Sequence, residues 1–372
     1  MHYPRKTVAK INLQALAHNF RAIKSLLAPQ TKFLASIKAN AYGHGAVRLA
    51  QELEHLGADM FGVACLYEVI ELRKAGIKLP ILNMAPTFAD EASAVLEYDY
   101  EATVFSFDIA KKISDAAVAF GKNAKIHIKV ETGMGRVGMA PEDVVKLVQE
   151  IKKLPNIVVE GLFTHFANAD VLSSDATLLQ LKIFNKVLND LAKAQVKIPL
   201  IHASNSAGAM LWPQSHFDMV RVGMSLYGYA PDCDLQLPIE LKPIMTLTAR
   251  VSHVKIVAAN TGISYGHKFH TLHESKIATL ATGYGDGLRR TPQNWGEVLC
   301  SGKRAPIVGQ VCMDQMMIDV SKVENVNVGD EVVLIGQQGD EEINIWNVAK
   351  RAETSAYEVA TSISARVTRV YY

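Results

Sequence analysis

Short apolar runs alternate with longer segments of helical periodicity over the first two-thirds of the chain. The runs are rich in β-branched and aromatic residues, a composition typical of buried strands. We predict strands at residues 33–38, 60–65, 80–84, 102–105, 125–130, 158–163, 199–202 and 219–223. Eight strands that alternate with helices indicate a parallel sheet, and eight such units close a (β/α)8 barrel.

The segments between these runs carry apolar residues on one helical face. In residues 176–194, Leu181, Val187 and Leu191 share such a face, and Asp175 is a capping candidate just before it. Residues 67–75, 107–120 and 141–153 have the same pattern. We expect these helices to cover the outside of the barrel.

The pattern changes near residue 240, where Pro238 and Pro243 interrupt the chain. Segments with strand character then take over, at residues 246–257, 276–282, 305–320 and 331–335, and residues 327–330 form a turn before the last one. We therefore predict an α/β protein of two domains. A TIM-like (β/α)8 barrel spans residues 1–241, and a mainly β domain spans residues 242–372.

Composition narrows the classes of function that need consideration. Of the 372 residues, 49% are hydrophobic and 20% are charged, which is ordinary for a globular protein, and the formal net charge of +2 gives no case for nucleic acid or an anionic membrane. The first residues lead into no apolar signal core, and no apolar run is long enough to span a bilayer. The four cysteines form no CxxC pair, so we expect no metal site and no disulfide framework. A reducing, cytoplasmic location fits this pattern. The cysteines are Cys65, Cys233, Cys300 and Cys312.

Lys38 is the first candidate for chemistry, because it ends the first predicted strand. A lysine at the C-terminal end of a buried strand can lie in an apolar pocket, where its pKa falls and its neutral amine can react with an aldehyde. Active sites of such barrels gather at the C-terminal ends of the strands.

Other reactive side chains follow the later strands in the same way. They are Lys129, Arg136, His165, Asn205, Ser206 and Arg221. The loops after the seventh and eighth strands often bind phosphate in barrels, and here they offer the Ser206 hydroxyl and the backbone of Gly223 and Met224. The placement of so many reactive groups favours one shared site with a phosphate-binding end.

The segment Lys38-Ala39-Asn40-Ala41-Tyr42-Gly43-His44-Gly45 closely resembles the pyridoxal-phosphate attachment segment of the alanine racemases, a family of fold-type III pyridoxal-phosphate enzymes. The stretches HFANAD at 165–170, HASNSA at 202–207 and GQVCMDQ at 309–315 extend the resemblance, which covers residues 5 to 370. The resemblance implies that pyridoxal 5'-phosphate is bound through its aldehyde to Lys38. It also implies a cytoplasmic homodimer.

The resemblance gives the barrel residues particular roles. Arg221 would face the pyridine nitrogen, Arg136 would hold the cofactor phenolate and the substrate carboxylate, and Lys129 occupies a position that is often carbamylated. His165 would support a catalytic tyrosine together with Arg221. The phosphate and the rest of the cofactor would be bound by Tyr42, Asn205, Ser206, Gly223, Met224 and Tyr357.

In the second domain, Tyr265 would act from the partner subunit on the face of the cofactor opposite Lys38. Racemisation needs a group on each face, since one removes the α-proton and another returns a proton. Met313 would bind the substrate carboxylate through its backbone N–H, and Tyr284 and Asp314 would form a gate. Gln310 stands where some relatives carry arginine, so this sequence departs from the family pattern at the gate.

The resemblance implies an amino-acid racemase that interconverts L-alanine and D-alanine and supplies D-alanine for peptidoglycan. A racemase of another small amino acid, such as serine, is an alternative, because a pocket rejects an added hydroxyl only weakly. A decarboxylase of the same plan should have a carboxylate at position 221. A non-catalytic pyridoxal-phosphate carrier would have no use for the second domain, and a protein without ligand would show no cofactor absorbance.

Overall fold

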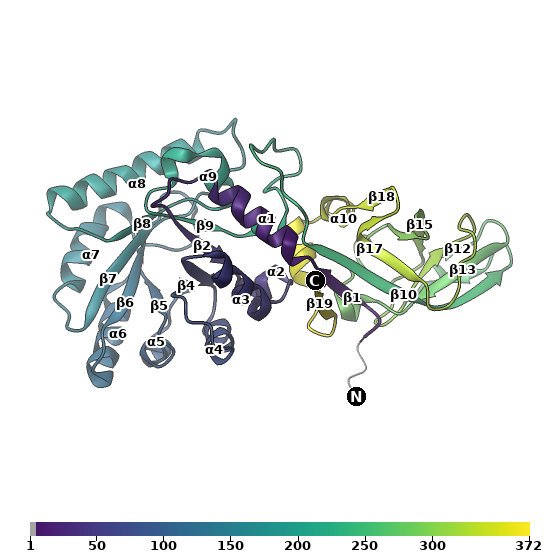
Figure 1. The fold of residues 1–372 in the computed structure, drawn as a ribbon, viewed down its shortest axis with the longest axis horizontal. Helices are drawn as coiled ribbons and strands as arrows, with labels where there is room; N and C mark the ends of the chain where they lie inside the picture. Colours follow the sequence, from purple (N-terminus) through teal and green to yellow (C-terminus); the bar gives the residue numbers. More distant parts are fainter. Residues whose placement is uncertain (1–4) are drawn as a thin grey trace. The chain divides into compact units, whose positions relative to one another are not determined.

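The computed structural model describes residues 5–372, and the chain forms two compact units (Figure 1). The barrel unit consists of residues 15–41 and 46–242, and the β-rich unit consists of residues 5–14, 42–45 and 243–372. The change of unit at residues 242–243 lies where the sequence pattern changes.

The barrel unit contains a parallel sheet of eight strands, in the order β8-β7-β6-β5-β4-β3-β2-β9. Each lies within two residues of a predicted strand, so the prediction of an eight-stranded barrel is confirmed. Backbone hydrogen bonds from Asp218 N–H to Ile201 O (3.0 Å) and from Arg221 N–H to Ser204 O (3.0 Å) join the last strands and close the barrel. The strands are β2 (Lys32–Ser36), β3 (Met60–Val63), β4 (Ile81–Pro86), β5 (Glu101–Val104), β6 (Ala124–Lys129), β7 (Ile157–Phe163), β8 (Leu200–His202) and β9 (Met219–Val222).

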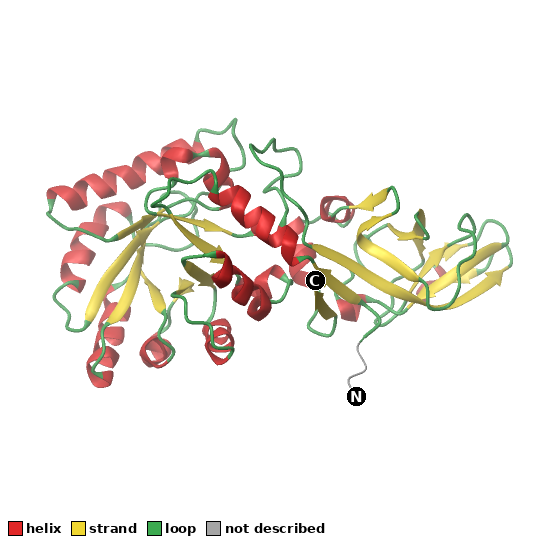
Figure 2. Cartoon of the chain, in the orientation of Figure 1, coloured by secondary structure: helices red, strands yellow, loops and turns green. Residues whose placement is uncertain are grey.

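Helices cover the outside of this sheet (Figure 2). The four helices predicted from periodicity correspond to α4, α6, α7 and α8, and their apolar faces are buried. The helices of the barrel unit are α1 (Leu13–Lys24), α3 (Ala46–Leu56), α4 (Leu66–Lys74), α5 (Ala92–Glu97), α6 (Phe107–Phe120), α7 (Val144–Ile151), α8 (Ala176–Lys193) and α9 (Ser206–Leu211), with short 3₁₀ turns at Ala89–Glu91, Pro141–Asp143, Pro213–Ser215 and Met224–Tyr227.

The interior of the barrel has an apolar part, formed by one buried cluster from five strands. Successive strand residues point to opposite faces, so residues two apart on one strand share the interior. The cluster consists of Leu34, Met60, Leu82, Leu200 and Met219, with Met84 packed against it. This packing fixes the strand ends on which the polar residues stand.

The β-rich unit is built on a nine-stranded sheet, in the order β18-β17-β14-β15-β16-β13-β10-β1-β19. A further pairing of β17 with β10 closes part of it into a ring. The strands are β1 (Val8–Ile11), β10 (Met245–Val257), β13 (Ser275–Leu280), β14 (Glu297–Cys300), β15 (Lys303–Val308), β16 (Met316–Asp319), β17 (Glu331–Gln338), β18 (Glu341–Ile343) and β19 (Thr368–Tyr371). The hairpin β11 (Gly262–Ile263) and β12 (Phe269–His270), helices α10 (Ile345–Arg351) and α11 (Ala356–Ser362), and 3₁₀ turns at Tyr265–His267 and Tyr284–Asp286 complete the unit.

Two features of this unit differ from the sequence prediction. The stretch 305–320 is two antiparallel strands, β15 and β16, separated by the loop 309–315, because Gly309 (φ 72°) turns the chain out of the ladder. The sequence analysis also placed residues 5–14 with the barrel. Instead, Val8–Ile11 pairs with β10 and β19, more than 230 residues away.

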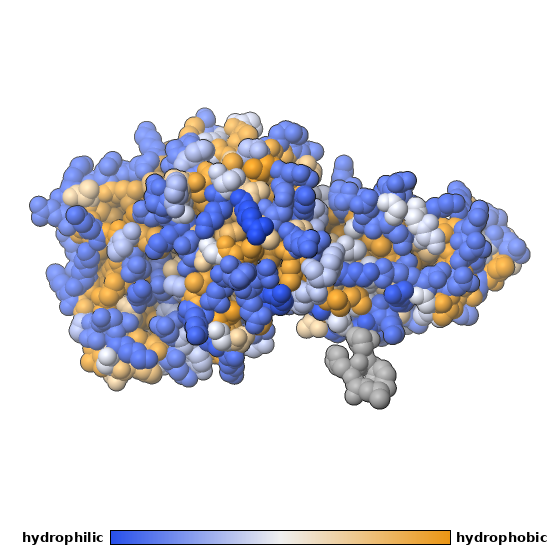
Figure 3. Space-filling view, viewed as in Figure 1, coloured by the Kyte–Doolittle hydropathy of each residue, from blue (hydrophilic) through white to orange (hydrophobic). Residues whose placement is uncertain are grey.

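Hydrophilic side chains cover most of the visible surface, with smaller apolar patches between them (Figure 3). Within residues 5–372, no helix has both the length and the apolar character needed to cross a membrane.

Candidate active site

Lys38 begins a left-handed turn that directly follows β2. The segment α2 (Lys38–Tyr42) has positive φ angles at Ala39, Asn40, Ala41 and Tyr42, between 49° and 54°. Each such residue costs about 1–2 kcal/mol when it is not glycine. The turn is held by a hydrogen bond from Ala41 N–H to Ile37 O (2.8 Å) and by Asn40 Oδ1, which accepts from Ala46 N–H (2.8 Å). Backbone strain of this kind is typical of functional sites.

The amine of Lys38 lies among cationic groups. Burial lowers its pKa, the charges of Arg136 and Arg221 lower it further, and Glu68 opposes them. A lysine in these surroundings offers a neutral amine at a lower pH than an exposed one does, which is what reaction with a carbonyl requires. The structure thus places Lys38 as the sequence predicted.

Lys129 ends β6 and is 2% exposed. Burial, followed by the charge of Arg221, lowers its pKa to about 7. Its amine donates to the carbonyl of Val130 (3.0 Å). The neutral amine of Lys129 is therefore far more accessible near physiological pH than that of an exposed lysine.

Arg136 lies in a loop organised by Glu131. The Glu131 carboxylate accepts backbone N–H groups of Gly133 (2.5 Å), Met134 (2.6 Å) and Arg136 (3.3 Å). Although burial opposes the shift, these bonds lower the pKa of Glu131. The loop therefore keeps the Glu131 carboxylate ionised beside the segment that carries Arg136.

Arg221 lies near the C-terminal end of β9, and its side chain is buried. Its Nη2 donates to the carbonyls of Thr164 (2.8 Å) and Ala203 (3.0 Å), and it lies 3.2 Å from His165 Nδ1. Its Nη1 lies 3.0 Å from His202 Nδ1. Burial and the charge of Arg221 hold the pKa of His165 well below its usual range, so the imidazole is neutral and Arg221 is the charged member of the pair.

The loops after β8 and β9 meet at Ser206 and Gly223. The N–H of Gly223 donates to Ser206 Oγ (2.9 Å), and Asn205 Oδ1 caps the following turn by accepting from Gly208 N–H (2.9 Å). Met224 follows directly in a buried 3₁₀ turn. The two loops predicted to bind phosphate are thus adjacent, with hydroxyl and backbone donors together.

These barrel residues fit pyridoxal phosphate chemically. Four cationic side chains influence one another across the site, and the described neighbours of Lys38 offer one opposing carboxylate, that of Glu68. Such a site favours a ligand with several negative charges, as a phosphate, a phenolate and a substrate carboxylate provide. The four are Lys38, Lys129, Arg136 and Arg221. The barrel unit thus offers a lysine amine that could attach such a cofactor and basic groups that could bind its anionic parts.

Tyr42 and Tyr357 pack together in the β-rich unit, with ring centroids 6.2 Å apart. The segment 42–45 is held closely there: a Cβ on Gly43 would lie 2.2 Å from Ala360 O, and Arg369 Nε donates to Gly43 O (3.0 Å). The structure therefore brings together the two tyrosines that the sequence assigned to phosphate.

Tyr265 lies on the surface of the β-rich unit, and 63% of it is exposed. It lines a hollow of about 510 Å³ with Ser264, His267, Cys312 and others. The Arg290 guanidinium lies 5.6 Å from the centre of the tyrosine ring and donates to Gln310 Oε1 (3.0 Å). Tyr265 thus presents its phenol outward, next to a cation that the sequence analysis did not single out.

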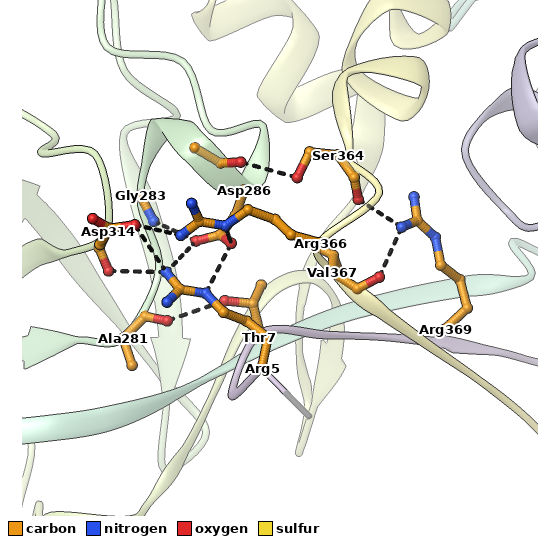
Figure 4. A network of polar contacts seen from close by, with 11 residues as sticks. Arg5, Thr7, Ala281, Gly283, Asp286, Asp314, Ser364, Arg366, Val367 and Arg369 are labelled. Carbon is orange, nitrogen blue, oxygen red and sulfur yellow. Dashed lines mark hydrogen bonds and ion pairs between the residues drawn. The ribbon is translucent and has the colours of Figure 1, made fainter. Parts of the chain in front are cut away.

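Two loops that carry Tyr284 and Met313 are joined by backbone bonds and by an ionic network (Figure 4). Tyr284 N–H donates to Cys312 O (2.9 Å), and Gly285 N–H donates to Met313 O (2.8 Å). Behind them, buried Asp286 accepts two bonds from Arg5 (2.8 and 3.0 Å) and one from Arg366 (2.8 Å).

Arg366 also donates to Asp314 at the end of the second loop (Figure 4). The network therefore fixes the relative position of the predicted gate residues Tyr284 and Asp314 and leaves Met313 52% exposed. Its basic members come from the two ends of the chain.

The structure groups the predicted residues into two sets, one in each unit. The barrel set contains Lys38, Lys129, Arg136, His165, Asn205, Ser206, Arg221, Gly223 and Met224, and the β-rich set contains Tyr42, Tyr265, Tyr284, Met313, Asp314 and Tyr357. Sequence reasoning missed the buried residues His127 and His202, which continue from Arg221 into the barrel. Polar residues at every second position of β6, in the sequence Ala-Lys-Ile-His-Ile-Lys, were the available signal.

Fold and site together define a class of protein. A (β/α)8 barrel with a strained lysine-bearing turn and a cationic site at the C-terminal strand ends, in a chain that also has a β-rich unit, has the features of an enzyme of amine–carbonyl chemistry.

Comparison with known proteins gives the family. Residues 11–231 match the family model of the alanine racemase N-terminal domain, and residues 244–371 match that of the C-terminal domain. The alanine racemase of Methanococcus maripaludis is 44% identical over 365 residues, which cover 98% of each chain. That of Halothermothrix orenii is 42% identical over 99% of this chain and 97% of its own.

Solved structures agree. An alanine racemase of Clostridium difficile in complex with cycloserine has a TM-score of 0.92 and 39% identity, covering 100% of this chain and 96% of its own. One from Bacillus anthracis with bound L-Ala-P has a TM-score of 0.95 and 35% identity, with the same coverage of the two chains. The chain belongs to the alanine racemase family.

Proposed function

We propose that this chain interconverts L-alanine and D-alanine with pyridoxal 5'-phosphate attached to Lys38. The observation that carries the proposal is the amine of Lys38, which lies at the end of β2 with a lowered pKa, beside Arg136 and Arg221. Similarity to alanine racemases over nearly the whole chain supports alanine as the substrate.

When bound, the pyridoxal group would withdraw electrons from the substrate α-carbon and make its proton acidic. Lys38 then takes or returns the α-proton on one face, since its neutral amine is a base. Arg136 binds the substrate carboxylate. Arg221 only donates hydrogen bonds, so it would accept a ring nitrogen as its partner only in the unprotonated form.

The second proton donor is Tyr265 of the partner subunit, acting on the opposite face. Its exposure in its own chain supports this role, because a phenol that works on another subunit must lie at the surface. Homodimerisation is part of the proposal, and so are a cytoplasmic location, the supply of D-alanine for peptidoglycan and the gate formed by Tyr284 and Asp314. The second domain, over residues 242–372, would contribute to the partner's site.

The test is α-proton exchange in deuterated water with chiral analysis. We expect L-alanine to gain deuterium and D-alanine to appear. In Tyr265→Phe, racemisation should fall by about 10²–10⁴-fold. In this proposal Lys38 serves the face that carries the α-proton of D-alanine, and Tyr265 of the partner subunit serves that of L-alanine. D-alanine should therefore still exchange with retained configuration, because Lys38 can remove and return the proton on its own face.

Tyr67→Phe is the matched control, since Tyr67 is an exposed tyrosine in helix α4 of the barrel. It should exchange and racemise as the unchanged chain does. Cofactor absorbance without exchange of alanine or serine would overturn the proposal and leave a cofactor carrier. Faster exchange of serine than of alanine would keep the reaction and change the substrate.

A further inference from the structure

A chain of four buried polar side chains crosses the interior of the barrel. Glu101 Oε2 lies 2.6 Å from His127 Nε2, His127 Nδ1 lies 2.9 Å from His202 Nε2, and His202 Nδ1 lies 3.0 Å from Arg221 Nη1. The two histidine side chains are fully buried, and Glu101 and Arg221 nearly so. These residues come from β5, β6, β8 and β9 (Figure 1).

The guanidinium decides the direction of every hydrogen bond in this chain. Arginine can only donate, so His202 Nδ1 is an acceptor. Burial beside Arg221 holds the pKa of His202 well below its usual range, so its ring is neutral and its one proton is on Nε2. That proton is donated to His127 Nδ1. The remaining proton of His127 is then on Nε2, where it is donated to Glu101.

The barrel leaves space between β6 and β8 for this chain of side chains. Strand β7 separates β6 from β8 in the sheet, and its residue beside His127 is Gly161. A Cβ on Gly161 would lie 2.1 Å from His127 Nδ1, so any side chain there would occupy the path between the two imidazoles. The register also shifts between Ile126 and His127, where β7 carries one extra residue, Glu160, so that Gly161 is the residue beside His127. Phe163 stacks on His202 at 4.8 Å and 4°, which holds the second ring.

Glu101 provides the charge that Arg221 otherwise lacks. Among the described residues, the hydrogen-bond partners of Arg221 are two imidazoles and two carbonyls, none of them an anion. An uncompensated buried guanidinium is costly. Glu101 itself has one near cation, Lys125 at 3.8 Å, whose side chain is half exposed. Hydrogen bonds in such a chain polarise one another, so the carboxylate stabilises Arg221 through the two rings.

We propose that Glu101, His127 and His202 are positioning residues that hold Arg221 as an oriented, charged donor, with Glu101 as its remote countercharge. The hydrogen-bond pattern belongs to the barrel alone. Its effect on catalysis rests on the proposed function, in which Arg221 faces the cofactor.

The first test reads the pattern directly. Nitrogen NMR of the holoenzyme with ¹⁵N-labelled histidine, assigned with His127→Gln and His202→Gln, should show both rings neutral and protonated on Nε2 at neutral pH. A proton on Nδ1 of either ring, or a doubly protonated ring, overturns the relay. This readout needs no activity, so it stands apart from failure of the proposed function.

The second test removes the countercharge and keeps the shape. In Glu101→Gln we expect the nitrogen resonances of both His127 and His202 to move. We also expect kcat to fall about tenfold, the equivalent of one pKa unit of interaction. KM should change less than about twofold, because substrate binding is not the interaction removed.

Thr103→Val is the matched control from the same strand. Thr103 is buried and donates to Asn83 O (2.6 Å), outside the relay. Thr103 pairs with His127 in the sheet, so this variant should lose stability and shift the His127 resonance slightly, while both ring tautomers and kcat stay unchanged. An equal loss of kcat in the two variants would mean that Glu101 has only a structural role.

A double-mutant cycle completes the test. His127→Phe breaks the relay, so adding Glu101→Gln should lower kcat no further. Additive losses would show that the two residues act independently and would overturn the relay.

Discussion

The two units of this chain hold buried charge by different means. In the barrel, one buried ion is the Arg221 cation, and its countercharge is reached through two imidazoles. In the β-rich unit, the buried ion is the Asp286 anion, which is 0% exposed and contacts Arg5 and Arg366 directly. Both arginines there reach solvent, with side chains 28% and 37% exposed.

The difference follows from what each network serves. A directly paired carboxylate would offset the charge of Arg221 at the site, whereas the relay keeps the carboxylate of Glu101 away from the strand ends. The charge of Asp286 does not have to stay uncompensated, because this carboxylate joins two loops. Arg5 and Arg366 therefore form direct ion pairs with its carboxylate.

The largest expected effect is on catalytic activity, and it distinguishes the network around Arg221 from the network around Asp286. Arg221→Lys should lower kcat by about 10²-fold, because an ammonium cannot donate to His202, Thr164 and Ala203 in the planar geometry of a guanidinium. Arg366→Lys, the matched change in the other network, should lower kcat by only a few fold. Steady-state kinetics measure both. Similar losses would mean that the two arginines serve the same purpose.

A smaller effect separates them by stability. Asp286→Asn should lower the free energy of unfolding by about 2 kcal/mol, because a neutral amide replaces the charged acceptor of the hydrogen bonds from Arg5 and Arg366. Asp314→Asn removes an exposed partner of the same Arg366 and should cost less than about 1 kcal/mol. Urea denaturation of the full chain, with the m-values compared, is the measurement. Equal losses would contradict a buried anchor at Asp286.

The smallest expected effect is on how the free energy of unfolding changes at acidic pH. Burial alone would raise the pKa of Asp286, but hydrogen bonds from Arg5 and Gly283 N–H lower it overall. A carboxyl with a lowered folded pKa stabilises the protein above its unfolded pKa, near 3.8, and this contribution is lost as pH falls through the folded value. Unfolding free energy should therefore fall more steeply with acid in the unchanged chain than in Asp286→Asn. Parallel curves below pH 3.8 would refute this assignment.

Much of the fold can be predicted from sequence patterns that span only a few residues. Strand and helix patterns repeat every few residues, so all eight barrel strands were predicted within two residues. Lys38 was predicted because a strand end and its turn residues are adjacent in sequence. The left-handed turn after it was not, since Ala39 and Ala41 have no local preference for positive φ.

What the sequence determined by itself is the barrel, the β-rich second part, the family and a set of candidate site residues. The tertiary structure decided which distant groups meet: Val8–Ile11 with β10 and β19, Arg5 with Asp286, and Glu101 with Arg221 through two histidines. The physical reason is range. Periodicity and turn chemistry act over a few residues, whereas a buried charge must find its partner across the fold, and no local pattern records which partner that is.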